Sequence, residues 1–264
     1  MDLKLKNKVV VITGGATGIG RAAAEEFLHE GAKVAVFARR KEVLQALHDD
    51  MVNEGYDLYF ESVDVTDTEG VKAFAQRVYE KFGAIDVWVN NAGTGKDRYF
   101  MDYTDADWER MNNINLKAVF ECIQIAASYM MKQNSGVILN ASSAAARIPF
   151  ANGVIYAATK AAVSSMTRSA AAALAPYGIR VVGYVPGMIV TPLVEHLVAA
   201  NPQKYTRNIA MGRVGCPADL AQPIVFLASN AARYITGIDL EISGGKLAVQ
   251  DCEWAWKDKA ENNR

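Results

Sequence analysis

Three side chains between Asn140 and Ala162 have the types and spacing of an acid–base site: Ser143, Tyr156 and Lys160. Tyr156 and Lys160 are four residues apart in an alanine-rich run, which predicts that both project from one face of a helix. An ammonium about 5 Å from a phenol oxygen, at an effective dielectric constant of about 20, favours the phenolate by roughly 3 kcal/mol. We therefore expect the pKa of Tyr156 to fall from about 10 towards about 8, where it exchanges protons near physiological pH.

Ser143 follows an apolar run, residues 137–139, that is typical of a buried strand. The loop after it contains proline and glycine and can return the chain to the same place, so that the hydroxyl holds a substrate oxygen beside Tyr156. Tyr-x-x-x-Lys also occurs in helices where the tyrosine is half-buried against a sheet and the lysine extends to solvent. The rest of the sequence must therefore decide whether Tyr156 and Lys160 form a catalytic pair or a structural one.

The N-terminal part predicts a strand, a glycine turn and a helix. Residues 8–13 are rich in β-branched side chains, and a helical pattern runs from Ile19 to Glu30. Between them, TGGATGIG (residues 13–20) places glycines where a backbone turns tightly and approaches a pyrophosphate at a helix N-terminus. An ordinary strand–helix turn is the alternative, but the position after the first strand favours dinucleotide binding.

The end of the second predicted strand, residues 33–37, bears on cofactor choice. An acidic side chain there would bond the adenosine ribose hydroxyls and repel a 2′-phosphate. The chain instead continues with Ala38, Arg39, Arg40 and Lys41. Because a guanidinium binds a phosphate through two hydrogen bonds, this charge favours NADP(H) over NAD(H). A solvated basic helix start is the alternative.

Strands and helices alternate along the chain, which predicts an α/β fold: a single-domain, doubly wound Rossmann fold with a parallel sheet of about seven strands and helices on both faces. The later strands are predicted at residues 58–63, 85–89, 137–139, 179–185 and 238–242, with helices at 67–82 and 105–133. Asn115 is a poor helix former within the long helix and marks a candidate functional kink.

Ligands of such sheets lie at the carboxyl ends of the strands, where three further motifs stand. Asp64 ends the third strand and is placed to meet the adenine amino group. NNAG (residues 90–93) follows the fourth strand as a turn of small residues, and PGMIVT (residues 186–191) follows the sixth. For Thr191 the alternative is a helix N-cap ahead of the segment from Leu193 to Ala200.

Composition narrows the class of protein. The 264 residues contain no linker or composition break, which predicts one domain over residues 1–264. The net charge of −1 provides no basic field, so we expect neither nucleic acid nor a membrane surface as a partner. The N-terminus reads as neither a secretory signal nor a membrane span, so a cytoplasmic location is expected. Three scattered cysteines and three scattered histidines predict no disulfide framework and no metal site.

Together these motifs resemble the short-chain dehydrogenase/reductase family in its short form of about 250 residues. The match runs from about residue 5 to residue 245, and TGGATGIG, NNAG, YAATK and PGMIVT occur in the family's order. The 13-residue spacing to Tyr156 selects Ser143 rather than Ser142 as the family's serine. The catalytic residues that the resemblance implies are Asn115, Ser143, Tyr156 and Lys160.

In the mechanism that the resemblance implies, nicotinamide passes hydride to a carbonyl carbon while Tyr156 protonates the oxygen, and alcohol oxidation is the reverse. Ser143 orients the oxygen, Lys160 holds the nicotinamide ribose and lowers the tyrosine pKa, and Asn115 supports a water relay. The implied cofactor-binding residues are Gly14, Thr17, Gly18, Ile19, Gly20, Arg39, Arg40, Asp64, Val65, Asn91, Ala92, Gly93, Tyr156, Lys160, Pro186, Gly187, Ile189 and Thr191.

Two features depart from the family pattern. Residues 180–182 are Arg-Val-Val where a pattern like RVN is frequent, and residues 246–264 form a C-terminal extension with Trp254 and Trp256. We expect this extension to pack on a neighbouring subunit or over the substrate mouth, with a disordered terminus as the alternative. Because the family commonly forms dimers and tetramers, a homo-oligomer, tetramer or dimer, is expected.

The expected substrate is a small-molecule carbonyl or alcohol. Apolar loops near residues 96–103, 145–154 and 188–211 favour a bulky apolar compound such as a hydroxysteroid. The alternative is a 3-oxoacyl carrier-protein reductase, which needs a basic patch, and its candidate residues are Arg98, Arg147 and Arg207. A non-catalytic NADPH-sensing or scaffold protein is an alternative of a different class. A sugar-nucleotide epimerase fits less well because of the glycine spacing. An enoyl reductase fits less well because those relatives space the tyrosine and the lysine more widely.

Overall fold

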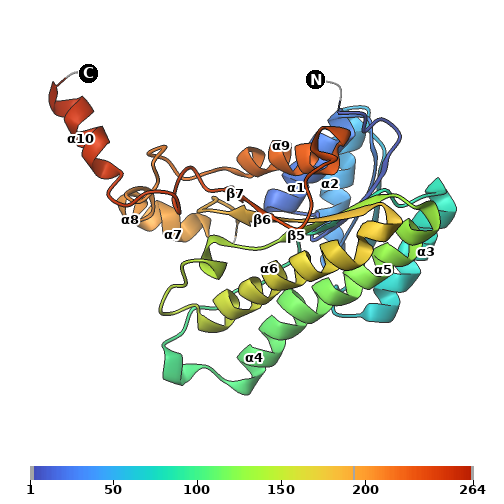
Figure 1. The fold of residues 1–264 in the computed structure, drawn as a ribbon, viewed down its shortest axis with the longest axis horizontal. Helices are drawn as coiled ribbons and strands as arrows, with labels where there is room; N and C mark the ends of the chain where they lie inside the picture. Colours follow the sequence, from blue (N-terminus) through green and yellow to red (C-terminus); the bar gives the residue numbers. More distant parts are fainter. Residues whose placement is uncertain (1–2, 193, 263–264) are drawn as a thin grey trace.

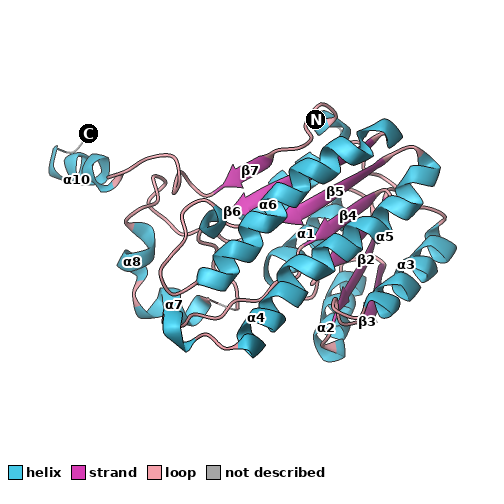
Figure 2. Ribbon diagram, turned by 60° about the horizontal axis from the view of Figure 1, so that its bottom comes forward, coloured by secondary structure: helices cyan, strands magenta, loops and turns pink. Residues whose placement is uncertain are grey.

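The computed structural model describes residues 3–192 and 194–262, which are built around a seven-stranded parallel sheet (Figures 1 and 2). The strand order is β3-β2-β1-β4-β5-β6-β7. The strands are β1 (Val9–Thr13), β2 (Lys33–Ala38), β3 (Leu58–Ser62), β4 (Val87–Asn90), β5 (Gly136–Ala141), β6 (Ile179–Pro186) and β7 (Asp239–Ile242). The predicted Rossmann fold is confirmed.

Helices cover both faces of the sheet because its strands are apolar on both sides. Val10 and Ile12 of β1 pack in one core with α1 (Gly18–His29), α2 (Lys41–Asn53) and α9 (Pro217–Ala228). Val9 and Val11 point the other way and pack with α3 (Thr68–Phe82), α5 (Ala118–Gln133) and α6 (Val154–Leu174), and Figure 1 shows the two layers. Burial on both faces explains the continuous hydrophobic runs in the sequence.

The predicted long helix over residues 105–133 is interrupted at the expected kink. It consists of α4 (Asp105–Asn112), a π-helical turn (Asn113–Lys117) and α5. A π turn contains an extra residue and rotates the side chains that follow it, a device common at functional sites. Asn115 is thereby buried beneath the sheet's carboxyl edge instead of facing solvent.

Short elements fill the carboxyl edge and the C-terminal end. The 3₁₀ turns are Phe100–Asp102, Ala144–Ala146, Ala175–Tyr177 and Asn230–Ala232, and the short helices are α7 (Glu195–Ala200), α8 (Pro202–Thr206) and α10 (Glu253–Asn262). The alternative of Thr191 as a helix N-cap is wrong, because α7 begins four residues later and Val194 is its N-cap. Leu193, where the segment was expected to begin, lies outside the described residues. In Figure 1, α10 lies away from the sheet, at the C-terminal end of the chain.

The order in which strands are added to the sheet reverses between β1 and β4. These two strands are neighbours in the sheet although α1, β2, α2, β3 and α3 lie between them in the chain. The chain leaves β1 towards one edge of the sheet and β4 towards the other, so a crevice forms at their carboxyl ends. The glycine turn and NNAG both stand there. Over the described ranges, no helix is long and apolar enough to cross a bilayer.

Candidate active site

Tyr156 and Ser143 meet where β5 ends and α6 begins. Tyr156 lies in the first turn of α6, and Ser143 precedes the 3₁₀ turn at residues 144–146, where its Oγ accepts a hydrogen bond from Ala145 N at 3.1 Å. The Ser143 side chain lies close enough to the Tyr156 hydroxyl to lower the tyrosine pKa. Ser142 instead faces the interior, 2.7 Å from Ser164 Oγ. The spacing rule that selected Ser143 agrees with this geometry.

Lys160 lies one helical turn beyond Tyr156 and is almost completely buried, with 3% of its surface exposed. Its Nζ donates to Ala141 O at 2.8 Å and lies 5.9 Å from the centre of the Tyr156 ring. A methyl group placed on Gly93 would lie 3.6 Å from this nitrogen. The lysine therefore points from α6 towards the ends of β4 and β5 and does not extend to solvent.

The pKa of Tyr156 moves in the opposite direction from the expectation. Loss of hydration around the phenol raises its pKa, and only the hydrogen bond with Ser143 lowers it. Burial also lowers the pKa of Lys160 to about 8, because its ammonium loses water as well. Desolvation of both groups therefore outweighs the Coulomb attraction that was expected from the charge of Lys160 alone.

Asn115 connects the loop after NNAG to α6. Its Oδ1 accepts from Thr94 N at 2.8 Å, and its Nδ2 donates to Thr94 O at 2.9 Å and to Thr159 Oγ1 at 3.2 Å. Thr159 Oγ1 in turn donates to Tyr156 O at 2.8 Å. Sequence reasoning missed Thr159, although its position three residues after Tyr156 places it beside the tyrosine on the helix.

The glycine turn leaves room for a phosphate group at the start of α1. Gly14 and Gly18 have φ of +65° and +56°, and a methyl group on Gly20 would lie 2.4 Å from Gly14 O and 2.5 Å from Asn91 Nδ2. The Thr17 side chain at the N-cap makes no cap hydrogen bond. The first amide groups of α1 are therefore free to bind an anion, and this part of the chain fits a dinucleotide pyrophosphate.

Hydrogen bonds attach NNAG to β1. Thr13 Oγ1 accepts from Asn91 N at 3.0 Å and from Ala92 N at 2.9 Å. Asn91 Nδ2 donates to the carbonyls of Thr13 and Gly14, each at 3.2 Å. Asn91 Oδ1 accepts from Tyr184 OH of β6 at 3.3 Å. The backbone of residues 91–93 is consequently held beside the glycine turn, as its position on the neighbouring strand predicts.

The loop after β6 crosses towards the same turn. Pro186 ends β6, and Gly187 packs so closely on Ser243 that a methyl group on it would lie 2.7 Å from Ser243 Cα. Ile189 is buried and forms a bridge with Gly215. A methyl group on Gly18 would lie 3.2 Å from Thr191 Cγ2. Residues 186–191 thus close the side of the crevice opposite NNAG.

The residues predicted for the adenosine end lie farther out, at the ends of β2 and β3. Arg39 and Arg40 are exposed, and Ser62 Oγ donates to Arg39 O at 2.8 Å. Asp64 Oδ1 accepts from Thr66 N at 2.9 Å and from Thr66 Oγ1 at 2.8 Å. Within residues 3–192 and 194–262, neither arginine side chain forms an ion pair. Ile19, in the first turn of α1, and Val65, shortly after β3, are both half-buried.

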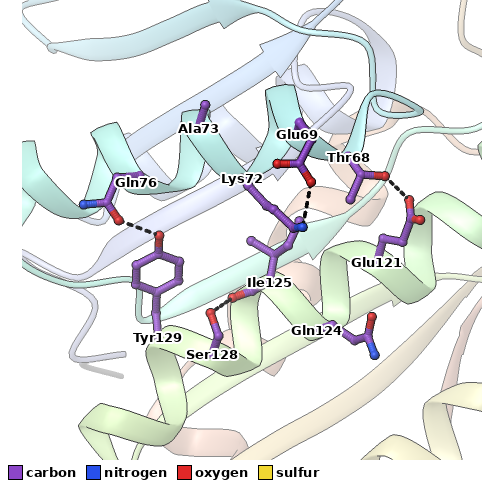
Figure 3. Close-up of a pocket in the computed structure, with 10 residues that line it drawn as sticks. All are labelled: Thr68, Glu69, Lys72, Ala73, Gln76, Glu121, Gln124, Ile125, Ser128 and Tyr129. Atoms are coloured by element: carbon purple, nitrogen blue, oxygen red, sulfur yellow. Dashed lines mark hydrogen bonds and ion pairs between the residues drawn. The ribbon is translucent and has the colours of Figure 1, made fainter.

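A hollow of about 740 Å³ lies elsewhere, on the outer surface between α3 and α5 (Figure 3). Much of its polar lining is paired internally: Glu69 with Lys72 at 2.7 Å, and Tyr129 with Gln76 at 3.1 Å. It contains none of the predicted site residues. A smaller hollow of about 170 Å³ lies beside the loop after β6, and it is lined by Met188, Ile189, Met211, Arg213, Gly215, Asp219, Ile242, Ser243 and Gly244. No metal-ligating cluster occurs in the described parts of the chain.

Comparison with known proteins agrees with this geometry. The family model for the short chain dehydrogenase matches residues 8–202. The chain is 38% identical over 239 residues to 3-oxoacyl-(acyl-carrier-protein) reductase FabG of Staphylococcus aureus, covering 90% of this chain and 97% of the relative. It is 37% identical over 250 residues to 3alpha-hydroxysteroid dehydrogenase of Mediterraneibacter gnavus, covering 92% and 98%.

Solved structures match over nearly the whole chain. The crystal structure of gox2181 has a TM-score of 0.91 and 32% identity, covering 94% of this chain and 98% of the other. A short-chain type dehydrogenase/reductase from Mycobacterium marinum has a TM-score of 0.89 and 34% identity, with the same coverage. With its parallel sheet, glycine turn and family match, the chain belongs to the short-chain dehydrogenase/reductase family, oxidoreductases that interconvert alcohol and carbonyl groups with a nicotinamide cofactor.

Proposed function

We propose that this protein is an NADP(H)-dependent oxidoreductase that transfers hydride between nicotinamide and the carbonyl or secondary alcohol carbon of a bulky apolar substrate. The observation that carries the proposal is the grouping of Ser143, Tyr156 and the buried Lys160 at the carboxyl edge of the sheet, with Lys160 Nζ 5.9 Å from the centre of the Tyr156 ring. The same edge holds the glycine turn that fits a pyrophosphate.

In the proposed reaction the bound nicotinamide supplies or accepts the hydride. During reduction, the Tyr156 hydroxyl donates its proton to the substrate oxygen, and Ser143 donates a hydrogen bond to the same oxygen. Burial keeps the phenol protonated before transfer, which suits a general acid. Lys160, whose pKa is lowered by burial to about 8, stabilises the phenolate left behind. Asn115 and Thr159 fix the helix turn that carries Tyr156.

The preference for NADP(H) rests on the end of β2. Arg39 and Arg40 are exposed there, and the strand ends in Ala38 rather than in an acidic residue. Since neither guanidinium is engaged by a carboxylate within the described residues, both are available to a 2′-phosphate. A charge-assisted hydrogen bond contributes roughly 1.5–3 kcal/mol, enough for a clear preference.

The substrate proposal rests on the loops around Tyr156. Five large apolar side chains are exposed there: Tyr99, Phe100, Met101, Ile148 and Phe150. A cluster of exposed large apolar side chains is characteristic of a binding site. Two of the three cations considered for a carrier protein are already paired, Arg98 with Asp107 at 2.8 Å and Arg147 with Glu241 at 2.9 Å. An acidic carrier protein therefore finds little free positive charge.

A 3-oxoacyl carrier-protein reductase is the second candidate, favoured by the identity to the S. aureus relative of that name. An NADPH-oxidation assay separates the two. The proposal expects a 3-oxosteroid or another bulky ketone to give the higher kcat/KM. A higher value with an acetoacetyl carrier protein would establish the second candidate instead.

We further propose a homo-oligomer, a dimer or tetramer. The long helices present exposed aromatic side chains, with Phe120 on α5 and Trp108 on α4. A closed symmetric pairing would bury such side chains. Light scattering of the purified protein measures the mass directly, and a monomeric mass would refute this part.

A further inference from the structure

Asp107 is a buried carboxylate outside the site described above. It lies in the first turn of α4 and is only 5% exposed. Two cations from the preceding loop flank it, with Lys96 Nζ at 2.9 Å and Arg98 Nε at 2.8 Å. Asp107 Oδ2 also accepts from Thr104 N at 3.3 Å, and Thr104 Oγ1 accepts from Asp107 N at 3.2 Å, the two reciprocal bonds of a capping box that starts the helix.

The Asp107 carboxylate is held in its charged form. The Lys96 ammonium holds the pKa of Asp107 well below its usual range, and the bonds from Thr104 act in the same direction. Because the group is buried and charged, removing its charge leaves Lys96 and Arg98 without their common partner. Residues 94–103, here called loop A, are thus attached to α4 at their centre through this carboxylate. At their start Arg110 of α4 holds them too, since its Nη2 donates to Thr94 Oγ1 at 3.2 Å and to Gly95 O at 3.4 Å.

Loop A is joined in turn to residues 147–153, here called loop B. Arg98 N donates to Asn152 O at 2.9 Å, and Asn152 Nδ2 donates to Asp97 Oδ2 at 2.9 Å. Tyr103 OH lies 2.8 Å from both Lys96 O and Asn152 O, so its one proton can reach either carbonyl. The two loops therefore share a continuous set of polar contacts next to the Asp107 ion pairs.

Both loops border the catalytic tyrosine. Asn115 holds Thr94, the first residue of loop A, through its backbone N and O. A methyl group placed on Gly95 would lie 3.7 Å from Tyr156 Cδ2. Loop B leads directly into α6, and Asn152 is four residues before Tyr156. A movement of either loop therefore changes the space beside the Tyr156 ring.

The two loops also carry the exposed apolar side chains of the proposed substrate site. Phe150 of loop B lies with its ring centre 6.4 Å from that of Tyr156. Loop A contributes Tyr99, Phe100 and Met101. These side chains come from two separate segments, so they form one binding wall only while the polar contacts hold the loops together.

We infer that Asp107 is a positioning residue: by binding Lys96 and Arg98 it couples loop A to loop B and sets the apolar wall against which a bulky substrate lies beside Tyr156. The effect on substrate selection rests on the proposed function. The coupling of the two loops does not depend on it.

The test compares Asp107→Asn with Asp105→Asn. Both variants remove one negative charge from the first turn of α4, but Asp105 is exposed, which makes it the matched control. Amide hydrogen exchange is measured over the whole chain, and kcat and KM are measured with NADPH and two probes, a 3-oxosteroid and cyclohexanone. Loss of a charged hydrogen bond corresponds to about tenfold or more in an equilibrium constant.

For Asp107→Asn we expect exchange to rise about tenfold in loops A and B together, and KM for the 3-oxosteroid to rise about tenfold. The KM for cyclohexanone and for NADPH should change less than about twofold, and Asp105→Asn should match the wild type in every measurement. A simple loss of stability would instead raise exchange in the sheet as well and lower kcat for both probes equally. That result would overturn the inference.

Unchanged exchange in loop B would also overturn it, because the coupling would then be absent. If Asp107→Asn does not fold, Lys96→Met replaces it, since Lys96 is partly exposed and Arg98 still neutralises the carboxylate. For Lys96→Met we expect the same increases in amide exchange of loops A and B and in KM for the 3-oxosteroid, but smaller ones. If the wild type reduces neither probe, the proposed function is wrong, while the exchange measurement still decides whether Asp107 couples the loops.

Discussion

Replacing Tyr156 by Phe removes one hydroxyl from the proposed site and leaves the ring. The ring contacts, with Phe150 at 6.4 Å between centres and Gly95 beside it, should remain. The loss of the hydroxyl beside Ser143 should change folding stability by about 1 kcal/mol at most, the size of one typical hydrogen bond. The transferable proton disappears entirely, so kcat should fall about 10²-fold to 10⁴-fold, the usual contribution of a general acid.

The assay follows NADPH oxidation with a ketone and measures NADPH affinity separately by fluorescence titration. We expect NADPH affinity within about twofold of the wild type, because the hydroxyl contacts Ser143 and not the glycine turn. Tyr234→Phe is the control, since Tyr234 is fully exposed. A kcat for Tyr156→Phe within a few-fold of the wild type would falsify the role of this tyrosine as the acid.

Three other variants test the cofactor site, the buried lysine and the tail. Ala38→Asp with Arg39→Ser should weaken NADPH binding about 10-fold to 150-fold; equal use of NADH by the wild type would contradict the reasoning. The pKa of Lys160, lowered by burial to about 8, means that the folded chain loses this proton before the unfolded chain does, so stability rises with pH between about 8 and 10.5. Denaturant unfolding should show the wild type gaining about 2 kcal/mol relative to Lys160→Met from about pH 7.5 to about pH 10, and parallel curves would refute the shift. Truncation after Leu247 should raise amide exchange in residues 207–212 about tenfold, and unchanged exchange there would show that the tail does not hold them.

The tail prediction comes from contacts that the sequence does not reveal. Trp256 Nε1 donates to Ala210 O at 3.0 Å, and a methyl group on Gly212 would lie 2.7 Å from the indole. Trp256 remains 48% exposed, and Trp254 is more exposed still. Trp256 therefore packs against residues 210–212 of its own chain, and packing of the tail on a neighbouring subunit or over the substrate mouth stays a prediction.

Local sequence patterns predicted the backbone of the site well. The order of strands and turns placed the glycine turn and NNAG at one crevice, and the four-residue spacing placed Tyr156 and Lys160 on one helix face. These are properties of period and of turn residues, which depend on near neighbours. Asn115 was identified as a break in a helix because asparagine is a poor helix former, although the π turn itself was not predicted.

Side-chain partners and electrostatics were less predictable because they depend on burial and on distant segments. Arg98 was considered as a free cation for a carrier protein, but the fold pairs it with Asp107. The pKa of Tyr156 was expected to fall, but the packing that removes water from Tyr156 and Lys160 is a tertiary property. Sequence spacing gives distances along one element and not the amount of water around a group.

The strand order has a consequence for how the protein acquires its site during folding. β1 pairs with β4, so that Val10 lies beside Val87, and the chain between them contains α1 and two further strand–helix units. Such long-range parallel pairing is slow, because the entropy of closing the intervening chain opposes it before the contacts form. The crevice for the dinucleotide lies at this junction. We therefore expect the centre of the sheet to be completed late, and a chain shorter than about the first 93 residues to lack the cofactor site altogether.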